Sequence, residues 1–581
     1  MPQQQFSLSW QNVNVEISEK SSSFWRSKSQ KRTILDNVSG STRSYSLVAI
    51  MGSSGSGKTT FLSAISGRRR DKKGILKINN TVVTDEDVRN VSGYLHQEDI
   101  FTQYLTPREH LEFMAALRLH NKSKEKRSIM KKLLSDLSLE GEGDTLIKNL
   151  SGGQRRRLSL AGELISDPLM LFCDEPTTGL DSYSALVVLQ KLHTIAFSGK
   201  IVLASIHQPS SQLFHYFNNI TLVAEGKLVF QGTKDEAKSF FESLDLHCPS
   251  SYNPADFYMD CLNREDLSKI VAVFQNRKKQ VVLCPHCDRC DNVSLEKQAK
   301  NHFFYELKWL LWRCFLDMGR NKSTHLRLYL FVVAELIFLS LAYSHVSLAD
   351  QDGAQNIEGF MSMIATEFTF TNMYAVINVF PGEIAVFLRE KDLYSAHSYF
   401  FSKIISMIPL SLISTVLYTT ILFLVLTFLD GIYLWLQMTY VMFVVGMASL
   451  GLGLAFSAHF STVEHVELFI GPLETIFFLL GGFSLQLDSV PTLFNWIKYI
   501  SPFYYSFDSL SNLFWRPFND TRHAENDTVP YYYGPQILEN YGIYSAYDPV
   551  PYDILYLHIL MAIFCFLGFL GILRKKILCS L

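Results

Sequence analysis

Six long apolar runs in the second half of the chain limit what it can fold into. Each run has about 20 residues, which is enough for a helix to cross the hydrocarbon core of a bilayer. The sequence therefore predicts an all-α transmembrane domain over residues 326–581. The six predicted spans cover approximately residues 327–346, 358–380, 401–428, 432–456, 465–486 and 553–573.

The first half of the chain has a different composition. Residues 1–275 alternate short apolar segments with polar helical stretches, a pattern typical of an α/β domain. The mean hydropathy of +0.10 therefore averages over two unlike halves. The strand candidates are residues 46–51, 169–173, 201–205 and 220–224.

Two segments connect these domains. Residues 276–300 are charged and have no clear period, which predicts a linker. Residues 301–325 predict an amphipathic connecting helix at the membrane surface or against the first domain, with Lys308, Arg313 and Arg320 away from its apolar face. That apolar face consists of Phe303, Phe304, Leu307, Leu310, Leu311, Phe315 and Met318.

The net charge of the chain and its cysteine content indicate which binding partners and which cellular compartment suit it. The formal net charge of −2 disfavours a nucleic-acid partner. Nine cysteines in 581 residues are too few for a disulfide scaffold and suit a reduced cytosol. Cys284, Cys287 and Cys290 lie close together, but zinc sites normally use separated ligand pairs and an iron–sulfur run needs a fourth cysteine. A reduced linker is therefore the favoured interpretation.

The first residues and the basic side chains predict the topology. Residues 1–19 contain no apolar core of a signal peptide, so we expect the first domain to stay in the cytosol. Arg389, Lys391 and Lys403 lie between the second and third spans, and residues 574–576 follow the sixth. Basic residues concentrate on the cytosolic side of membrane proteins, so these positions agree with that orientation.

A large outer loop is expected over residues 488–551. It contains two sequons, which make Asn519 and Asn526 candidates for glycosylation on the exterior or lumenal side. The predicted protein is thus a multi-pass membrane protein in contact with lipid, in the plasma membrane or an intracellular vesicle membrane.

A glycine-rich loop directly after the strand candidate 46–51 is the strongest local motif. Such a loop wraps its backbone N–H groups around phosphates at a helix N-terminus, with Lys58 reaching the β- and γ-phosphates and Thr59 ligating Mg²⁺. ATP and Mg²⁺ are the expected cofactors. The predicted nucleotide-binding residues are Gly52, Ser53, Ser54, Gly55, Ser56, Gly57, Lys58, Thr59 and Thr60.

Two carboxylates follow the apolar strand candidate 169–173. Asp174 is suited to hold Mg²⁺, and Glu175 is suited to orient and polarise the attacking water, because phosphoryl transfer depends on positioning and charge neutralisation. Two adjacent acids alone would more often be a solvated turn. Their place after a strand, downstream of a phosphate loop, favours the catalytic interpretation.

The segment Leu150-Ser151-Gly152-Gly153-Gln154 indicates the family, because the chain resembles the ATP-binding cassette superfamily, of which LSGGQ is the signature. The resemblance implies that Ser151, Gly152, Gly153, Gln154 and Asp181 contact ATP. It also implies catalytic roles for Gln97 and His207, with Gln97 as a further metal ligand. An ATPase domain placed before six spans is the order of the G subfamily. Segments similar to the White-type half-transporters are residues 174–182, 253–257, 377–380, 387–390 and 496–502.

The resemblance implies an ATPase coupled to transmembrane transport. One chain has one phosphate loop and one signature, so a second half-transporter is required, as a homodimer or a related heterodimer. We expect export or sequestration of a small amphipathic molecule, with a pigment precursor or other aromatic metabolite favoured. A sterol, lipid or xenobiotic exporter of the same subfamily is an alternative, and an ATP-gated regulatory protein without uphill transport is an alternative of another class.

Acidic residues inside the predicted spans indicate where cargo could bind. Carboxyls within a membrane normally face a bundle interior or a wet cavity. The second and fifth spans line the cavity in the resembling family, so the predicted substrate-cavity residues are Glu367, Phe368, Thr371, Glu474, Thr475 and Phe483. Alternatively, the glutamates bond helix to helix, or Glu467 lies at the cytosolic edge. The adenine-stacking aromatic is not fixed by the sequence, with Trp10 and Trp25 as candidates.

Overall fold

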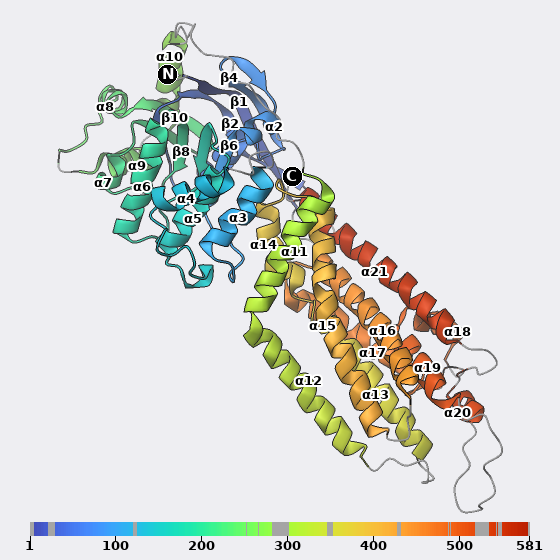
Figure 1. Ribbon diagram of the computed structural model, residues 1–581. Coiled ribbons are helices and arrows are strands. Elements are labelled where there is room, and N and C mark those ends of the chain that lie inside the picture. Colours follow the sequence, from blue (N-terminus) through green and yellow to red (C-terminus); the bar gives the residue numbers. More distant parts are fainter. Residues whose placement is uncertain are drawn as a thin grey trace, which may run out of the picture. The chain divides into compact units, whose positions relative to one another are not determined.

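The computed structural model divides the chain into two compact units, Met1–His302 and Phe303–Cys579, which are described separately (Figure 1). The described residues are 5–20, 29–119, 125–250, 252–264, 267–281, 301–344, 353–426, 431–485, 487, 490–516, 534–541, 543 and 549–578. Asn519, Asn526, Trp25 and the three linker cysteines lie outside these ranges, so the predictions about them stay predictions.

The first unit is built on a six-stranded sheet with the order β10-β9-β3-β8-β7-β6, in which β9, β3, β8, β7 and β6 run parallel. Every residue of β3, β7 and β8 is buried, as expected for central parallel strands covered on both faces. The α/β P-loop fold class is confirmed, and all four strand candidates are strands. The six strands are β3 (Ser46–Met51), β6 (Ser92–Leu95), β7 (Met170–Cys173), β8 (Ile201–Ser205), β9 (Asn219–Ala224) and β10 (Lys227–Thr233).

A second, antiparallel sheet has the order β2-β1-β4-β5 and was not foreseen from the sequence. Its strands are β1 (Ser7–Lys20), β2 (Ser29–Arg43), β4 (Lys72–Ile78) and β5 (Thr81–Val83). Trp10 of β1 is 1% exposed and packs edge-on against Phe61, so its ring is not available for stacking on a base.

Helices complete the first unit, and α10 extends into the segment predicted as a linker. The pattern there has no clear period because the only apolar residue among positions 276–281 is Val281. The helices are α1 (Lys58–Ile65), α2 (Asp85–Asn90), α3 (Pro107–Arg118), α4 (Lys126–Asp136), α5 (Gly152–Leu164), α6 (Ser182–Phe197), α7 (Ser211–Phe214), α8 (Lys234–Glu242), α9 (Pro254–Arg264) and α10 (Leu267–Val281).

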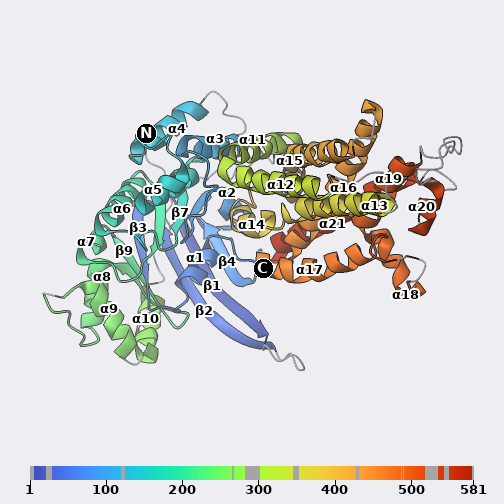
Figure 2. The same ribbon diagram turned by 90° about the horizontal axis from the view of Figure 1, so that it is seen from below.

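Helices are the regular secondary structure of the second unit's described residues. Helix α16 lies at its centre and packs against α13, α15, α19 and α21 (Figures 1 and 2). The helices are α11 (Phe303–Arg320), α12 (Lys322–Ala342), α13 (Gly353–Tyr374), α14 (Val379–Arg389), α15 (Ala396–Val425), α16 (Ile432–His459), α17 (Val463–Leu479), α18 (Thr492–Asn495), α19 (Pro502–Trp515), α20 (Gly534–Asn540) and α21 (Val550–Leu578).

Small residues allow α16 to take this central position. A Cβ added at Gly453 would lie 2.5 Å from the Met373 carbonyl oxygen, and one at Gly446 would lie 2.8 Å from the Phe368 ring. Helices in lipid associate through such close packing, because lipid tails are as apolar as the side chains.

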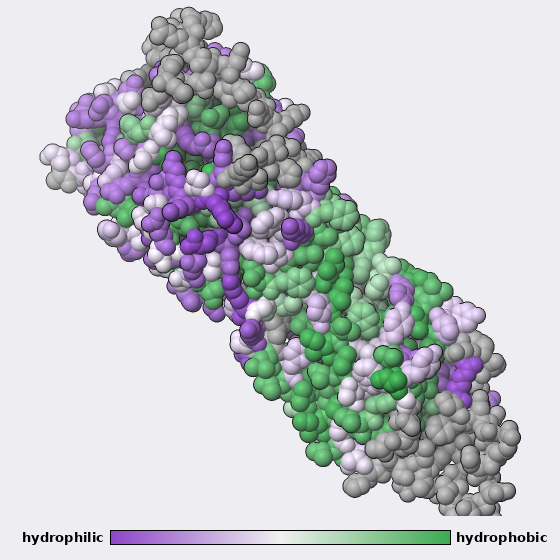
Figure 3. Space-filling model, viewed as in Figure 1, coloured by the Kyte–Doolittle hydropathy of each residue, from purple (hydrophilic) through white to green (hydrophobic). Residues whose placement is uncertain are grey.

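Four helical segments are long and apolar enough to cross a membrane: Gly353–Arg389, Ala396–Val425, Ile432–His459 and Val550–Ile577. A shorter apolar helix covers Tyr329–Ala342, and α17 is 17 residues long with Pro472 inside it. Helices therefore occur in all six predicted ranges, while the count of six membrane crossings stays a prediction. On the face drawn in Figure 3, apolar residues gather over the second unit and hydrophilic residues over the first.

Two features of the second unit differ from the predicted spans. The second predicted span breaks into α13 and α14, because residues 375–378 form turns instead of continuing the helix. The segment predicted as an outer loop contains α19, most of whose residues are buried. Ser509 donates to Asp553 of α21 and Ser511 donates to Glu358 of α13, so polar side chains of α19 face other helices.

The connecting segment forms the helix α11, and its buried residues within the second unit include two charged side chains. Glu306 and Arg313 are 6% and 5% exposed, whereas Phe304 is 79% exposed. The Glu306 carboxylate accepts hydrogen bonds from the Ser395 backbone N–H at 2.9 Å and the Ser398 hydroxyl at 2.6 Å, at the positive N-terminus of α15. These polar contacts, together with Leu310, which is 0% exposed, hold α11 within the second unit.

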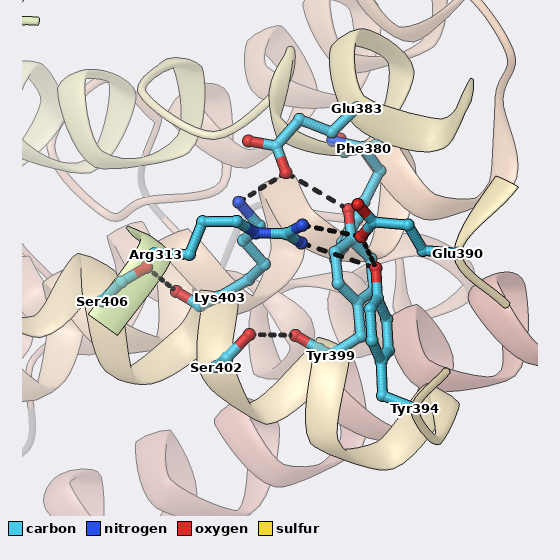
Figure 4. Close-up of polar contacts among 10 residues, drawn as sticks. Arg313, Phe380, Glu383, Glu390, Tyr394, Tyr399, Ser402, Lys403 and Ser406 are labelled. Atoms are coloured by element: carbon cyan, nitrogen blue, oxygen red, sulfur yellow. Dashed lines mark hydrogen bonds and ion pairs between the residues drawn. The ribbon is translucent and has the colours of Figure 1, made fainter. Parts of the chain in front are cut away.

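Arg313 reaches from α11 into a buried polar network with α14 and α15 (Figure 4). Its Nη1 donates to Glu390 Oε2 at 2.6 Å, and the Tyr394 hydroxyl donates to the same oxygen at 2.8 Å. Beside this pair, Lys403 forms an ion pair of 2.5 Å with Glu383. Lys403 was predicted only as a cytosolic charge. It is in fact 7% exposed and joins α15 to α14.

Candidate nucleotide site

The predicted catalytic segments all follow strands at one edge of the large sheet. Strands β3, β8, β7 and β6 are parallel neighbours, so their carboxyl ends share that edge. The glycine-rich loop follows β3, the two acids follow β7, His207 follows β8 and Gln97 follows β6. Ligands of open α/β sheets bind at this edge, so the structure brings the sequence-predicted residues to the expected place.

The backbone of the loop requires its glycines. A Cβ at Gly52 would lie 2.2 Å from the Val223 carbonyl oxygen, and Gly57 has a φ of 99°, in the left-handed region, as the N-cap of α1. A Cβ at Gly55 would meet nothing within 4 Å, and the buried Ser56 hydroxyl has no partner among the described residues. The loop therefore offers open space and an unsatisfied donor, as a phosphate site requires.

Lys58 is held by the loop itself. Its ammonium donates to the carbonyl oxygens of Gly52 at 2.8 Å and Ser53 at 2.9 Å. Burial lowers the pKa of Lys58, and the charges of Glu175 and Asp174 act in the opposite direction. The cation thus lies within the electrostatic range of both acids.

Asp174, which follows β7, forms hydrogen bonds with residues of α1 and β8 at this edge of the sheet. The hydroxyl of Thr59 donates to its Oδ1 at 3.1 Å, and the hydroxyl of Ser205 donates to the same atom at 2.7 Å. Burial raises the pKa of Asp174, while these two hydrogen bonds lower it. An oxygen pair from Thr59 and Asp174 has the chemistry that Mg²⁺ prefers, so the donor set fits this ion.

Glu175 is positioned by its neighbours at the same edge. Gln97 Nε2 donates to its Oε2 at 2.9 Å and the Thr178 hydroxyl donates to the same oxygen at 3.1 Å. The backbone N–H of Glu175 donates to the Ser205 hydroxyl at 2.8 Å, and its φ of 45° lies in the left-handed region. His207 is exposed beyond the end of β8. The geometry leaves the second carboxylate oxygen of Glu175 available to a water.

The signature segment begins α5. Ser151 is the N-cap, and its hydroxyl and the Gln154 side chain form a reciprocal capping box. A Cβ at Gly153 would lie 2.7 Å from the Ser184 hydroxyl, so this glycine permits close packing against the start of α6. Asp181 caps α6 by accepting from the Ser184 N–H at 3.0 Å. The signature and Asp181 are thus adjacent, and the free N–H groups at the start of α5 can bind an anion.

Arg156, immediately after the signature, was missed by the sequence analysis. It is 2% exposed, and its guanidinium donates to the carbonyl oxygens of His96, Gln97, Asp174, Glu175 and Pro176 and to the Asp99 carboxylate. The run Arg155-Arg156-Arg157 reads as a solvated basic face, and nothing in it singles out its middle member. The structure shows that this side chain holds the backbones of both Gln97 and Glu175.

We expect Arg156→Lys to lower kcat for ATP hydrolysis by about tenfold or more with little change in ATP affinity. Lysine has three donors and cannot satisfy the six acceptors, so Glu175 and Gln97 lose backbone support. Steady-state ATPase assays and nucleotide binding measure the two effects. Arg155→Lys, at a neighbouring position whose side chain makes none of these contacts, is the control. Equal effects of the two changes would contradict this role.

Cys173, the last residue of β7, provides a test of burial at the site. It is 0% exposed, and burial raises the pKa of its thiol to about 12. Because the thiolate is the reactive form, we expect iodoacetamide to leave Cys173 unmodified in the folded protein and to alkylate the half-buried Cys248 much faster. Mass spectrometry of digests before and after unfolding gives the result. Rapid native labelling of Cys173 would contradict the buried strand.

The predicted cavity residues of the second unit do not all share one environment. Phe368 is 0% exposed and packs in the core against Tyr418 and Gly446, so it lines no open surface in this unit. Its place follows from the helix period, which turns Phe368 about 100° away from the half-buried Glu367. The hydroxyls of Thr371 and Tyr418 lie 3.2 Å apart, which joins α13 to α15.

The fifth predicted span holds the other three cavity candidates. Glu474 Oε2 accepts a hydrogen bond of 2.9 Å from the Tyr374 hydroxyl of α13. One oxygen of Glu474 therefore bonds helix to helix, which was the alternative to a role in the cavity. Thr475 is exposed and donates to the Gly471 carbonyl at 3.2 Å. Phe483 stacks on Tyr541 with ring centroids 6.0 Å apart.

Comparison with known proteins agrees with this architecture. Residues 35–178 match the family described as ABC transporter, and residues 207–284 and 305–515 match families described as ABC-2 type transporter. The fold and the site therefore define an ABC transporter that carries its ATPase and its membrane domain in one chain.

Relatives narrow the family. The chain is 34% identical to Protein white of Drosophila melanogaster, over 93% of this chain and 83% of that protein. It is 31% identical to Protein scarlet of the same species, over 88% of this chain and 82% of that protein. It is 29% identical to the broad substrate specificity ATP-binding cassette transporter ABCG2 of Mus musculus, over 87% of this chain and 83% of that protein. The chain belongs to the White-type half-transporters of the ABC transporter G family, as predicted, and its first unit is an ATPase coupled to transport.

Proposed function

We propose that the protein dimerises with a second half-transporter and uses ATP to move a small amphipathic molecule across a membrane. The observation that carries this proposal is that the signature residues and the glycine-rich loop lie on different elements of the first unit. The signature residues pack on Gly179, Leu180 and Ser184. Among the described residues, no hydrogen bond joins them to the glycine-rich loop. Each half therefore offers two phosphate-binding surfaces on different elements, which supports a dimer that encloses ATP between the loop of one chain and the signature of the other.

The residues at the sheet edge take distinct roles in this proposal. Thr59, Asp174 and Gln97 would hold Mg²⁺, which supplies charge neutralisation at the phosphates. Glu175 orients and polarises the attacking water, and His207 contacts the γ-phosphate from the end of β8. Arg156 positions Glu175 and Gln97 through their backbones.

The proposed cargo is an aromatic metabolite such as a pigment precursor. Its support is the likeness to the White-type proteins together with acidic and aromatic side chains on α13 and α17. The first unit is proposed to be cytosolic, with the protein in the plasma membrane or an intracellular vesicle membrane. Either a homodimer or a heterodimer with a related chain fits the intact set of catalytic residues.

The test is purification of the native dimer by affinity to this chain, followed by an ATPase and uptake screen in lipid discs and sealed vesicles. We expect a half-transporter to co-purify and an amphipathic aromatic compound to stimulate ATP hydrolysis and accumulate in vesicles only with ATP. Stimulation by sterols alone would favour a lipid exporter. ATP hydrolysis without accumulation of any compound would favour a regulatory protein and would overturn the proposal.

A further inference from the structure

Glu474 of α17 has an unsatisfied carboxylate oxygen. The residue is 7% exposed. Its Oε2 accepts the Tyr374 hydroxyl at 2.9 Å, whereas Oε1 is buried without a partner among the described residues. A buried carboxylate oxygen in a membrane domain is costly to leave unpaired, and such groups normally meet a partner on a substrate or ion pathway. The helix-to-helix bond to Tyr374 therefore accounts for only half of this side chain.

The surroundings of Glu474 supply acceptors and open space. A Cβ built on Gly471, about one turn earlier, would meet nothing within 4 Å. Pro472 has no N–H, so the helical hydrogen bond to the Leu468 carbonyl cannot form. Glu467, about one turn before Gly471, is exposed and lies within electrostatic range of the Tyr374 hydroxyl. The hydroxyl of Thr475 is already bonded to the Gly471 carbonyl.

No cation on the neighbouring helices balances this group. The sequences of α13, α16, α17 and α19 contain neither lysine nor arginine. The lysine of α15, Lys403, is already paired with Glu383. These helices therefore supply no lysine or arginine for Glu474, which favours a positive charge brought by a molecule that enters the site.

The arrangement favours an ammonium group over a metal ion. Glu467 and Glu474 are seven residues apart, a rise of about 10 Å along the helix, so they cannot both ligate one ion. A protonated amine, in contrast, carries up to three donors and needs only acceptors of this kind. The half-exposed Tyr374 ring and Phe478, one turn beyond Glu474 on the same face, add aromatic surface for a cation and for an apolar body.

We propose that Glu474, held by Tyr374, recognises the protonated amine of an amphipathic aromatic substrate. The inference rests on the proposed transport function and names its substrate class. Glu467 attracts the cation, and Glu474 Oε1 accepts its hydrogen bond next to the open space at Gly471. The Tyr374 hydroxyl fixes the other carboxylate oxygen, so Tyr374 is a positioning residue.

The test uses two probes that differ in charge. Tryptamine is a protonated aromatic amine, and N-acetyltryptamine is its neutral analogue. The purified dimer in lipid discs is assayed for stimulated ATPase, and in vesicles for uptake. For Glu474→Gln we expect the half-maximal tryptamine concentration to rise by about tenfold or more, with the half-maximal concentration of N-acetyltryptamine unchanged.

Two further variants keep the result interpretable. Glu464→Gln, in the exposed first turn of the same helix, should change neither response. Tyr374→Phe retains the carboxylate and should weaken the tryptamine response to a smaller extent, which tests the site even if Glu474→Gln accumulates poorly. Equal responses of wild-type protein to both probes, or an equal shift for both probes in Glu474→Gln, would overturn the inference while leaving transport intact. No ATP-dependent uptake of either probe would count against the proposed aromatic cargo itself.

Discussion

Replacing Glu175 by glutamine should abolish nearly all ATP hydrolysis while ATP binding persists. A positioned base contributes about 10²–10⁴-fold to a rate, and glutamine cannot take up or polarise the proton of the attacking water. It retains an oxygen that can still accept from Gln97 and Thr178, which lie 2.9 and 3.1 Å from the native carboxylate. The site should therefore keep its shape and its affinity for ATP, as measured by ATPase assays and by binding of a labelled nucleotide.

The matched control is Glu98→Gln, which removes an exposed carboxylate one residue after Gln97. We expect near wild-type hydrolysis from this variant. Transport into vesicles should cease in a dimer whose catalytic glutamates are all replaced. Persistent uptake by such a dimer, or equal losses in the two variants, would show that Glu175 is not the group that activates water.

The nucleotide site could be predicted because each part is a contiguous segment with a fixed place in the fold. The phosphate loop needs Gly52 and Gly57 for its backbone, and Asp174 and Glu175 must follow a buried strand. Parallel strand order then brings these segments to one edge. Arg156 could not be predicted in the same way, because its acceptors are backbone carbonyl groups, which are present at every position of a sequence.

In the second unit, hydropathy predicts where helices lie but not which of their residues face another helix. Apolar length located helices in all six predicted ranges, because any helix in lipid must be apolar outside. It could not reveal the buried α19, whose Ser506, Ser509 and Ser511 are 0% exposed, or the break after Tyr374. These features depend on which residues face another helix. The same reason explains α11, whose Arg313 is buried in an ion pair with Glu390, whereas Phe304 of the same helix is 79% exposed.

That charged pair should carry a large share of the stability of the second unit. Arg313→Met removes the guanidinium that lies 2.6 Å from the buried Glu390 carboxylate, while the hydrogen bond from the neutral Tyr394 hydroxyl at 2.8 Å stays. Breaking one partner of a buried ion pair typically costs about 3–5 kcal/mol, because the other charge stays buried. We expect a marked fall in the thermal unfolding temperature of the purified protein and in its yield, whereas Lys308→Met, at an exposed position of the same helix, should change neither.

A double-mutant cycle separates the ion pair from a loss of packing. If the damage comes from the unpaired charge, adding Glu390→Gln to Arg313→Met should restore most of the lost stability, since the glutamine is neutral and can still accept from Tyr394. If Arg313 matters chiefly through its aliphatic stem, the double variant should be as unstable as the single one. The geometry favours the first outcome, because Arg313 Nη1 lies 2.6 Å from Glu390 Oε2 and the two side chains are 6% and 7% exposed.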